Sequence, residues 1–93
     1  MREAAIEESF VRQATQHGWL ALKLTAPGRG FPDRTVFTPW GVFFIEFKRE
    51  GGRVSKAQEL WLELLSPYGK CCVAYSAAAA MEFIKMHKKR RRR

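Results

Sequence analysis

FPDRTVFTPWGVFFIEFKRE, residues 31–50 of a 93-residue chain, reads as two strands joined by a turn. Its halves, DRTVFT and GVFFIEFK, are rich in β-branched and aromatic residues, which favour strands. Pro39, Trp40 and Gly41 lie between them, and a proline early with a glycine late in a tight turn is typical of a hairpin. The stretch therefore predicts two antiparallel paired strands.

Two charged residues interrupt the second of these strands. Glu46 and Lys48 are two residues apart, so they share a face with Val42 and Phe44. Asp33, the one aspartate of the chain, comes just before the first strand, so a hairpin can bring it near Glu46 or Lys48. A cross-strand salt bridge at a sheet edge is one interpretation. A functional site is the other, because a buried acid needs a partner or a metal ion.

The chemistry of these residues suits a hard cation. Mg²⁺ prefers oxygen ligands, typically few carboxylates and several waters, and the carbonyl of Phe47 could add an oxygen to Asp33 and Glu46. Such an ion would lower the pKa of a bound water and stabilise a transferring phosphoryl group. Lys48 would position the water or neutralise developing charge.

A helix is expected over residues 3–17, with an apolar face formed by Ile6, Phe10, Val11 and Ala14. Glu7 falls within the arc of that face, where a shared metal ion or Lys48 could pair with it. Alternatively, Glu7 lies at the edge of the face and reaches solvent. Glu3 lies on nearly the same side and Glu8 lies farther away, so the choice among the three stays open.

The remaining elements follow from local patterns. Strands are expected over 19–25 and 70–76, and a last helix over 77–86. Ser55 and Gln58 form a capping-box pattern at the start of another helix. Its apolar residues recur at helical spacing and should face the sheet; they are Ala57, Leu60, Trp61, Leu64 and Leu65. The order α-β-β-β-α-β-α predicts a single mixed α/β domain.

Charge is unevenly distributed along the chain. The net charge is +8, and residues 88–93 supply six of the 17 basic residues. The remaining 11 basic residues face 9 acidic ones, so residues 1–87 are mildly basic. We expect a domain over 1–87 and a disordered tail over 88–93 that binds a polyanion, with nucleic acid favoured over a membrane surface.

Other features exclude several classes of protein. No apolar run approaches the ~18 residues of a membrane helix, and the N-terminus lacks the pattern of a signal peptide, so we expect a cytoplasmic location. Cys71 and Cys72 are adjacent, which suits neither a mutual disulfide nor a zinc site. His17 and His87 have no second ligand at metal spacing and are expected at the surface.

The segments GFPD, VFFIEFK, SKAQELW and PYGKCCVAY, in this order, resemble the VRR-NUC domain of the PD-(D/E)xK nuclease superfamily, in its stand-alone phage and bacterial form. The resemblance covers about residues 5–76, with Pro32-Asp33 and Glu46-Phe47-Lys48 at the motif positions. It implies a restriction-endonuclease-like core, a mixed central sheet flanked by helices. It also implies Mg²⁺- or Mn²⁺-dependent deoxyribonuclease activity in a phage-encoded protein or a bacterial cytoplasm.

The resemblance also implies roles for individual residues. Asp33, Glu46 and the Phe47 carbonyl would bind metal, and Lys48 would act on the attacking water. Glu7 matches the family's glutamate on the first helix, as a further metal ligand. Gln58 matches a catalytic glutamine, although it also has the capping explanation. Leu62 stands where some relatives have a tyrosine, so no role carries over there.

The implied substrate is branched DNA, such as a Holliday junction, cut by a homodimer with two symmetric sites. Trp19 and Trp40 could serve the dimer interface or pack within the domain. Phosphate contacts are expected from Arg29, Arg34, Arg49, Arg53 and Lys56. The alternatives are an end-dependent exonuclease, a restriction-like nuclease, and a non-catalytic nucleic-acid-binding module.

Overall fold

The computed structural model describes residues 1–88 and has the element order α-β-β-β-α-β-α. The elements are α1 (Glu3–Gln16), β1 (Leu20–Leu22), β2 (Arg34–Thr38), β3 (Gly41–Phe47), α2 (Lys56–Leu65), β4 (Lys70–Ala74) and α3 (Ala77–Met86). The expected α/β class and order of elements are therefore confirmed. The predicted tail falls outside the described residues, except for Lys88.

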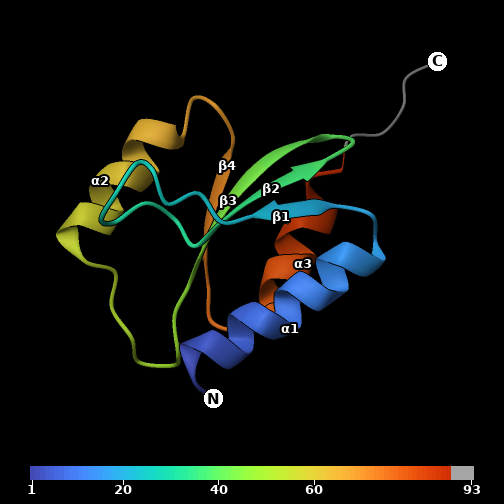
Figure 1. Cartoon of the computed structure of the whole chain (residues 1–93), viewed down its shortest axis with the longest axis horizontal. Coiled ribbons are helices and arrows are strands. Elements are labelled where there is room, and N and C mark those ends of the chain that lie inside the picture. The colour runs from blue at the N-terminus through green and yellow to red at the C-terminus, as the bar shows by residue number, and fades with distance from the viewer. Residues whose placement is uncertain (89–93) are drawn as a thin grey trace.

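One mixed sheet of four strands, in the order β1-β2-β3-β4, organises the domain (Figure 1). β1, β2 and β3 are antiparallel neighbours, whereas β3 and β4 are parallel. The predicted hairpin is present, with Thr38 opposite Gly41 at the turn and Arg34 opposite Ile45 near its open end. β1 is shorter than predicted, because its last residue, Leu22, pairs with Thr35 just after β2 begins.

The main core lies between one face of the sheet and the helices α1 and α3. Phe43, Ile45 and Phe47 alternate along β3 and are almost completely buried. Phe47 packs its ring 5.3 Å from that of Phe10 on α1. Trp19 is buried in the same cluster and packs edge to face against Trp40, with the ring centroids 5.6 Å apart. These two tryptophans therefore pack within the domain.

Helix α2 and the loop between β1 and β2 lie together at one end of the sheet (Figure 1). Phe31 of the loop stacks edge-on against both Phe44 of β3 and Trp61 of α2. The backbone of Gly30 comes so close to α2 that an added Cβ would be 2.8 Å from the Cβ of Ala57. The loop thus packs between the sheet and α2.

The prediction that Leu60 and Leu64 face the sheet is wrong. Both are more than half exposed, at 56% and 54%. Trp61 and Leu65 of α2 are the half-buried residues instead. The apolar positions of this helix span more than one face, so not all of them can contact the rest of the protein. No helix in residues 1–88 is long and apolar enough to cross a membrane.

Candidate metal and catalytic site

Asp33 and Glu46 lie side by side at the open end of the β2–β3 hairpin. Arg34 pairs with Ile45, so Asp33, one residue earlier, comes opposite Glu46. The Asp33 Oδ2 atom accepts a 2.8 Å hydrogen bond from the backbone N–H of Phe47. The pairing of the two acids, expected from the sequence, is therefore present, and the backbone of β3 holds Asp33 in place.

Glu46 is a buried carboxylate with an incomplete set of partners. Its side chain belongs to a residue only 3% exposed. Oε2 accepts a 2.8 Å hydrogen bond from Nε2 of Gln58 and lies 3.7 Å from Nζ of Lys48. Oε1 has no hydrogen-bond partner within residues 1–88. A buried carboxylate oxygen without a donor is costly, so this atom is ready to bind a cation or an incoming donor.

The orientation of the Gln58 amide is fixed by the cap of α2. Ser55 is the N-cap, and its backbone N–H donates to Oε1 of Gln58 at 2.8 Å. A backbone N–H can only donate, so the oxygen of the amide must face Ser55 and the NH₂ group must face Glu46. The capping box expected from the sequence and the contact with Glu46 are therefore two functions of one side chain.

The electrostatic environment favours protonation of both acids. Burial, followed by the charge of Asp33, raises the pKa of Glu46 to about 7, although Lys48 opposes this shift. Burial also raises the pKa of Asp33, against the hydrogen bond from Phe47, and the charge of Glu7 raises it further. Burial is thus the main reason why both acids have raised pKa values, and the nearby charge of Lys48 does not cancel it.

Glu7 finds other partners than those expected. Its Oε2 lies 2.7 Å from Nε of Arg34 and 3.0 Å from Nζ of Lys23. Arg34 also donates from Nη1 to the carbonyl of Ala21 at 3.0 Å. Glu7 is therefore close enough to influence Asp33 but is held by two cations. Accordingly, residues 1–88 contain no group of three or more His, Cys, Asp or Glu side chains arranged to bind a metal ion.

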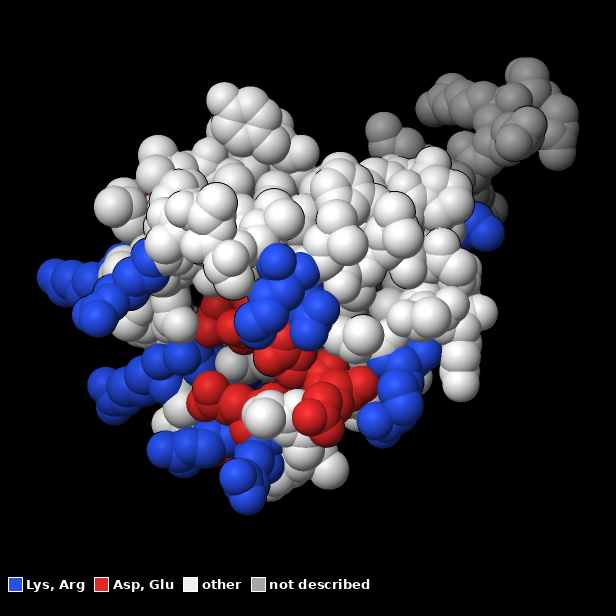
Figure 2. Space-filling view, viewed as in Figure 1, with Lys and Arg blue, Asp and Glu red and all other residues white. Residues whose placement is uncertain are grey.

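Figure 2 shows a patch of acidic side chains on one face of the molecule, with lysine and arginine side chains around it. Of the predicted phosphate-binding residues, Arg34 is engaged by Glu7. Arg29, Arg49, Arg53 and Lys56 are exposed and form no ion pair within the described part of the chain. The backbone carbonyl of Arg29 accepts a 3.1 Å hydrogen bond from Nε1 of Trp61, which anchors the β1–β2 loop to α2.

The sequence interpretation missed Lys23 and Arg34 as partners of Glu7, and Ser55 as the residue that orients Gln58. The capping pattern contained the signal for Ser55. Nothing in local spacing connects residue 7 with residues 23 and 34.

No protein-family model matches this sequence, and no curated protein or solved structure matches it significantly.

Proposed function

We propose that this protein is a metal-dependent endonuclease that hydrolyses phosphodiester bonds in branched DNA, such as a Holliday junction. The observation that carries the proposal is the pair Asp33 and Glu46, with Lys48 beside it and one oxygen of Glu46 without a hydrogen-bond partner among residues 1–88. A purely structural salt bridge would neutralise the acids. Here burial raises the pKa of both acids, and Lys48 does not cancel this effect.

The residues present fit a divalent ion. Mg²⁺ is commonly bound by one or two carboxylates and completes its shell with water and substrate oxygens, so a third protein carboxylate is not required. Asp33 and Glu46 would hold Mg²⁺ or Mn²⁺, with the Phe47 carbonyl as a further ligand. The chemistry supplied by the bound ion is a lower pKa for water and stabilisation of phosphoryl charge.

The protein's own side chains have distinct proposed roles. Lys48, 3.7 Å from Glu46, positions the attacking water, whose oxygen bonds to phosphorus as the bond to the leaving oxygen breaks. Gln58 holds Glu46 in place through its 2.8 Å hydrogen bond. Glu7 would become a metal ligand only by giving up its contacts with Arg34 and Lys23.

The DNA would be held through its backbone. Exposed arginines and Lys56 would attract phosphates without reading bases, which favours selection by shape rather than by sequence. These cations are the predicted phosphate contacts Arg29, Arg49, Arg53 and Lys56.

A homodimer would place two such sites on one branched substrate. A domain with a radius of gyration of 12.9 Å is small compared with a four-way junction. A two-fold symmetric pair can make two matched cuts. Leu20, Leu22 and Phe37 are exposed on one face of β1 and β2 and provide apolar surface for such contact. The proposed location is the cytoplasm of a bacterium, with the protein encoded by the host or a phage.

The first test is cleavage of a labelled immobile four-way junction beside linear duplex and single-stranded DNA. Each substrate is incubated with Mg²⁺, Mn²⁺ or EDTA, and with wild type or Glu46→Gln. We expect metal-dependent, symmetric nicks in the junction that are lost in the variant. Cutting of every substrate would remove the selectivity for branched DNA. Equal cutting by Glu46→Gln would contradict the assigned site.

A second test does not depend on activity. A ligand that binds only the folded state stabilises it, by roughly 2.7 kcal/mol at 100 times its Kd. Mg²⁺ should therefore raise the Tm of wild type at pH 8, where Glu46 is ionised, and raise that of Glu46→Gln much less. Glu59→Gln, on the exposed part of α2, is the matched control and should respond like wild type. An equal response in all three proteins would exclude metal binding by Glu46.

A further inference from the structure

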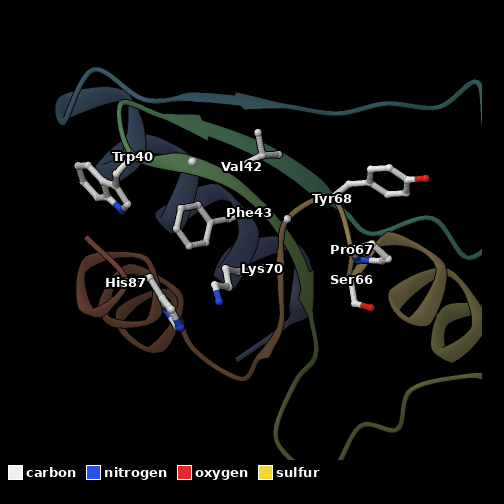
Figure 3. A pocket seen from close by; sticks show the side chains of 10 residues that line it. Trp40, Val42, Phe43, Ser66, Pro67, Tyr68, Lys70 and His87 are labelled. Atoms are coloured by element: carbon white, nitrogen blue, oxygen red, sulfur yellow. The ribbon is translucent and has the colours of Figure 1, made fainter. Parts of the chain in front are cut away.

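A separate open pocket, of about 310 Å³, lies at the start of β3. Its lining comes from the β2–β3 turn, the segment that leads into β4, and the end of α3 (Figure 3). Phe43, in the lining, is three residues from Glu46, or roughly 10 Å along the strand, and its side chain points to the opposite face. The pocket therefore lies at the end of β3 away from the acidic pair, and both Val42 and Phe43 line it.

The pocket is cationic and contains no counter-ion from the protein. None of the residues that line it is acidic, and Lys70 and His87 both belong to the lining. Figure 3 shows Lys70 and His87 on the same side of β3 as Phe43. Lys88 lies next to the pocket, because its Nζ atom is 5.3 Å from the centre of the ring of Trp40, which lines it. The ion pairs within residues 1–88 use Lys23, Arg34 and Lys48, so Lys70 and Lys88 have no carboxylate partner there.

The fold accounts for only part of this charge. Lys88 follows the end of α3, where the partial negative charge of a helix C-terminus stabilises a cation. The Nδ1 atom of His87 donates locally, to the carbonyl of Phe83 at 2.8 Å. Lys70 begins a β-strand and has no such explanation. Its ammonium group is available to an anion from outside the protein.

An aromatic side chain at the same pocket favours a nucleic-acid strand over free phosphate as the anion. Tyr68 is 77% exposed, and Figure 3 shows its ring reaching outward from the segment before β4. Tyr68 and Lys70 line the same pocket but point to different sides of it. Proteins bind nucleic-acid strands by combining exposed aromatic rings, on which bases stack, with lysines that contact phosphates. Binding of free phosphate would require only the cationic side chains and would leave Tyr68 without a role.

We propose that this pocket and the adjoining Lys88 form a second nucleic-acid contact, in which Lys70 and Lys88 bind backbone phosphates and Tyr68 stacks on a base exposed at the branch point or at a strand end. The inference rests on the proposed function, because it takes DNA as the ligand. A single straight duplex docked at the acidic pair would reach this pocket only if it lay along β3 or were bent, and bending costs free energy. A branched DNA has a second arm for this pocket, so the pocket would favour branched over linear DNA.

The test measures binding without cleavage. Fluorescence anisotropy in EDTA gives the affinity of the full chain for a four-way junction and for a linear duplex, from about 50 to 200 mM salt. Each phosphate contact contributes about 0.9 to the slope of log K against log salt, or roughly a 3.5-fold change in affinity over this range. Lys70→Gln and Lys88→Gln should each lower the junction slope by about 0.9, and the double variant by about 1.8. Tyr68→Ala should weaken junction binding without changing the slope.

Lys85→Gln is the matched control. It also removes one positive charge, but from a residue of α3 that does not line the pocket. If it lowers the slope as much as Lys70→Gln does, the effect is one of net charge and the proposal is overturned. An unchanged slope in Lys70→Gln, or an effect of that variant on anionic phospholipid vesicles alone, also overturns it. Wild-type binding that depends on Lys70, without metal-dependent cleavage, would keep this contact and reject the nuclease.

Discussion

Gln58 donates a 2.8 Å hydrogen bond from Nε2 to Oε2 of Glu46 while its Oε1 accepts from the backbone N–H of Ser55. One side chain thus connects the start of α2 with the buried acid of β3. Movement of the helix cap and the position of the carboxylate are therefore coupled.

Replacement of Gln58 by alanine should affect both ends of this connection. The half of the capping box that the Gln58 side chain makes would be lost, at a cost of about 1 kcal/mol, and Glu46 would lose a donor, at a further cost of about 1–3 kcal/mol. Ser55→Ala removes the hydroxyl of the cap but keeps the backbone N–H that orients Gln58. Urea unfolding should show a larger loss for Gln58→Ala than for Ser55→Ala. Equal losses would mean that the contact with Glu46 contributes nothing to stability.

Asp33→Asn should lower the pKa of Glu46. The charge of Asp33 is the second largest cause, after burial, of the shift to about 7, and an asparagine removes the charge but can still accept from the Phe47 N–H. Titration of the Glu46 carboxyl carbon by NMR measures the change. Glu63→Gln, an exposed position on α2, controls for loss of one negative charge far from the site. A pKa of Glu46 that is the same in Asp33→Asn and wild type would show that burial alone causes the shift.

The stability of the metal-free protein should fall as the pH rises from 4.5 to 7. Glu46 has a pKa near 4.5 when exposed and about 7 in the folded protein, so between these values the folded state binds more protons than the unfolded state. Stability from this group is present below pH 4.5 and is lost as the pH rises through the folded pKa, by up to roughly 3 kcal/mol.

Urea unfolding in EDTA across this pH range tests the sign. Glu46→Gln cannot titrate at this position and should show a flatter dependence. Other carboxylates contribute to both proteins alike, so the difference between the two curves isolates Glu46. A wild-type curve that rises relative to that of the variant between pH 4.5 and 7 would contradict a raised pKa.

Gly30→Ala should destabilise the protein more than Gly28→Ala. Both glycines have left-handed backbone angles, with φ of +89° and +94°, so both substitutions carry a similar backbone cost of about 1 kcal/mol. Only at Gly30 does the new Cβ meet α2, 2.8 Å from Ala57, and overpacking adds about 1–3 kcal/mol. Thermal unfolding of both variants measures the difference. Equal Tm values would mean that α2 moves aside without cost.

The hairpin was predictable because its strands and turn lie within one short stretch, and the turn sets which residues face each other. The pairing of Asp33 with Glu46 follows directly from that register. The partners of Glu7 were not predictable, because they depend on how α1 lies against β1 and β2. Leu60 and Leu64 were misplaced for a related reason. Helical spacing gives the width of an apolar face but not which part of it meets the sheet.

The hydrogen bond from Phe47 to Asp33 limits which insertions the hairpin can accept during evolution. A single residue inserted in the turn at Trp40 would shift one strand against the other and turn every following side chain to the opposite face. Glu46 would then enter the apolar layer beside Phe10, and its neighbour Asp33 would lose its backbone anchor. The length of this turn is therefore as strictly constrained as the acidic residues themselves, although no residue of the turn belongs to the acidic site.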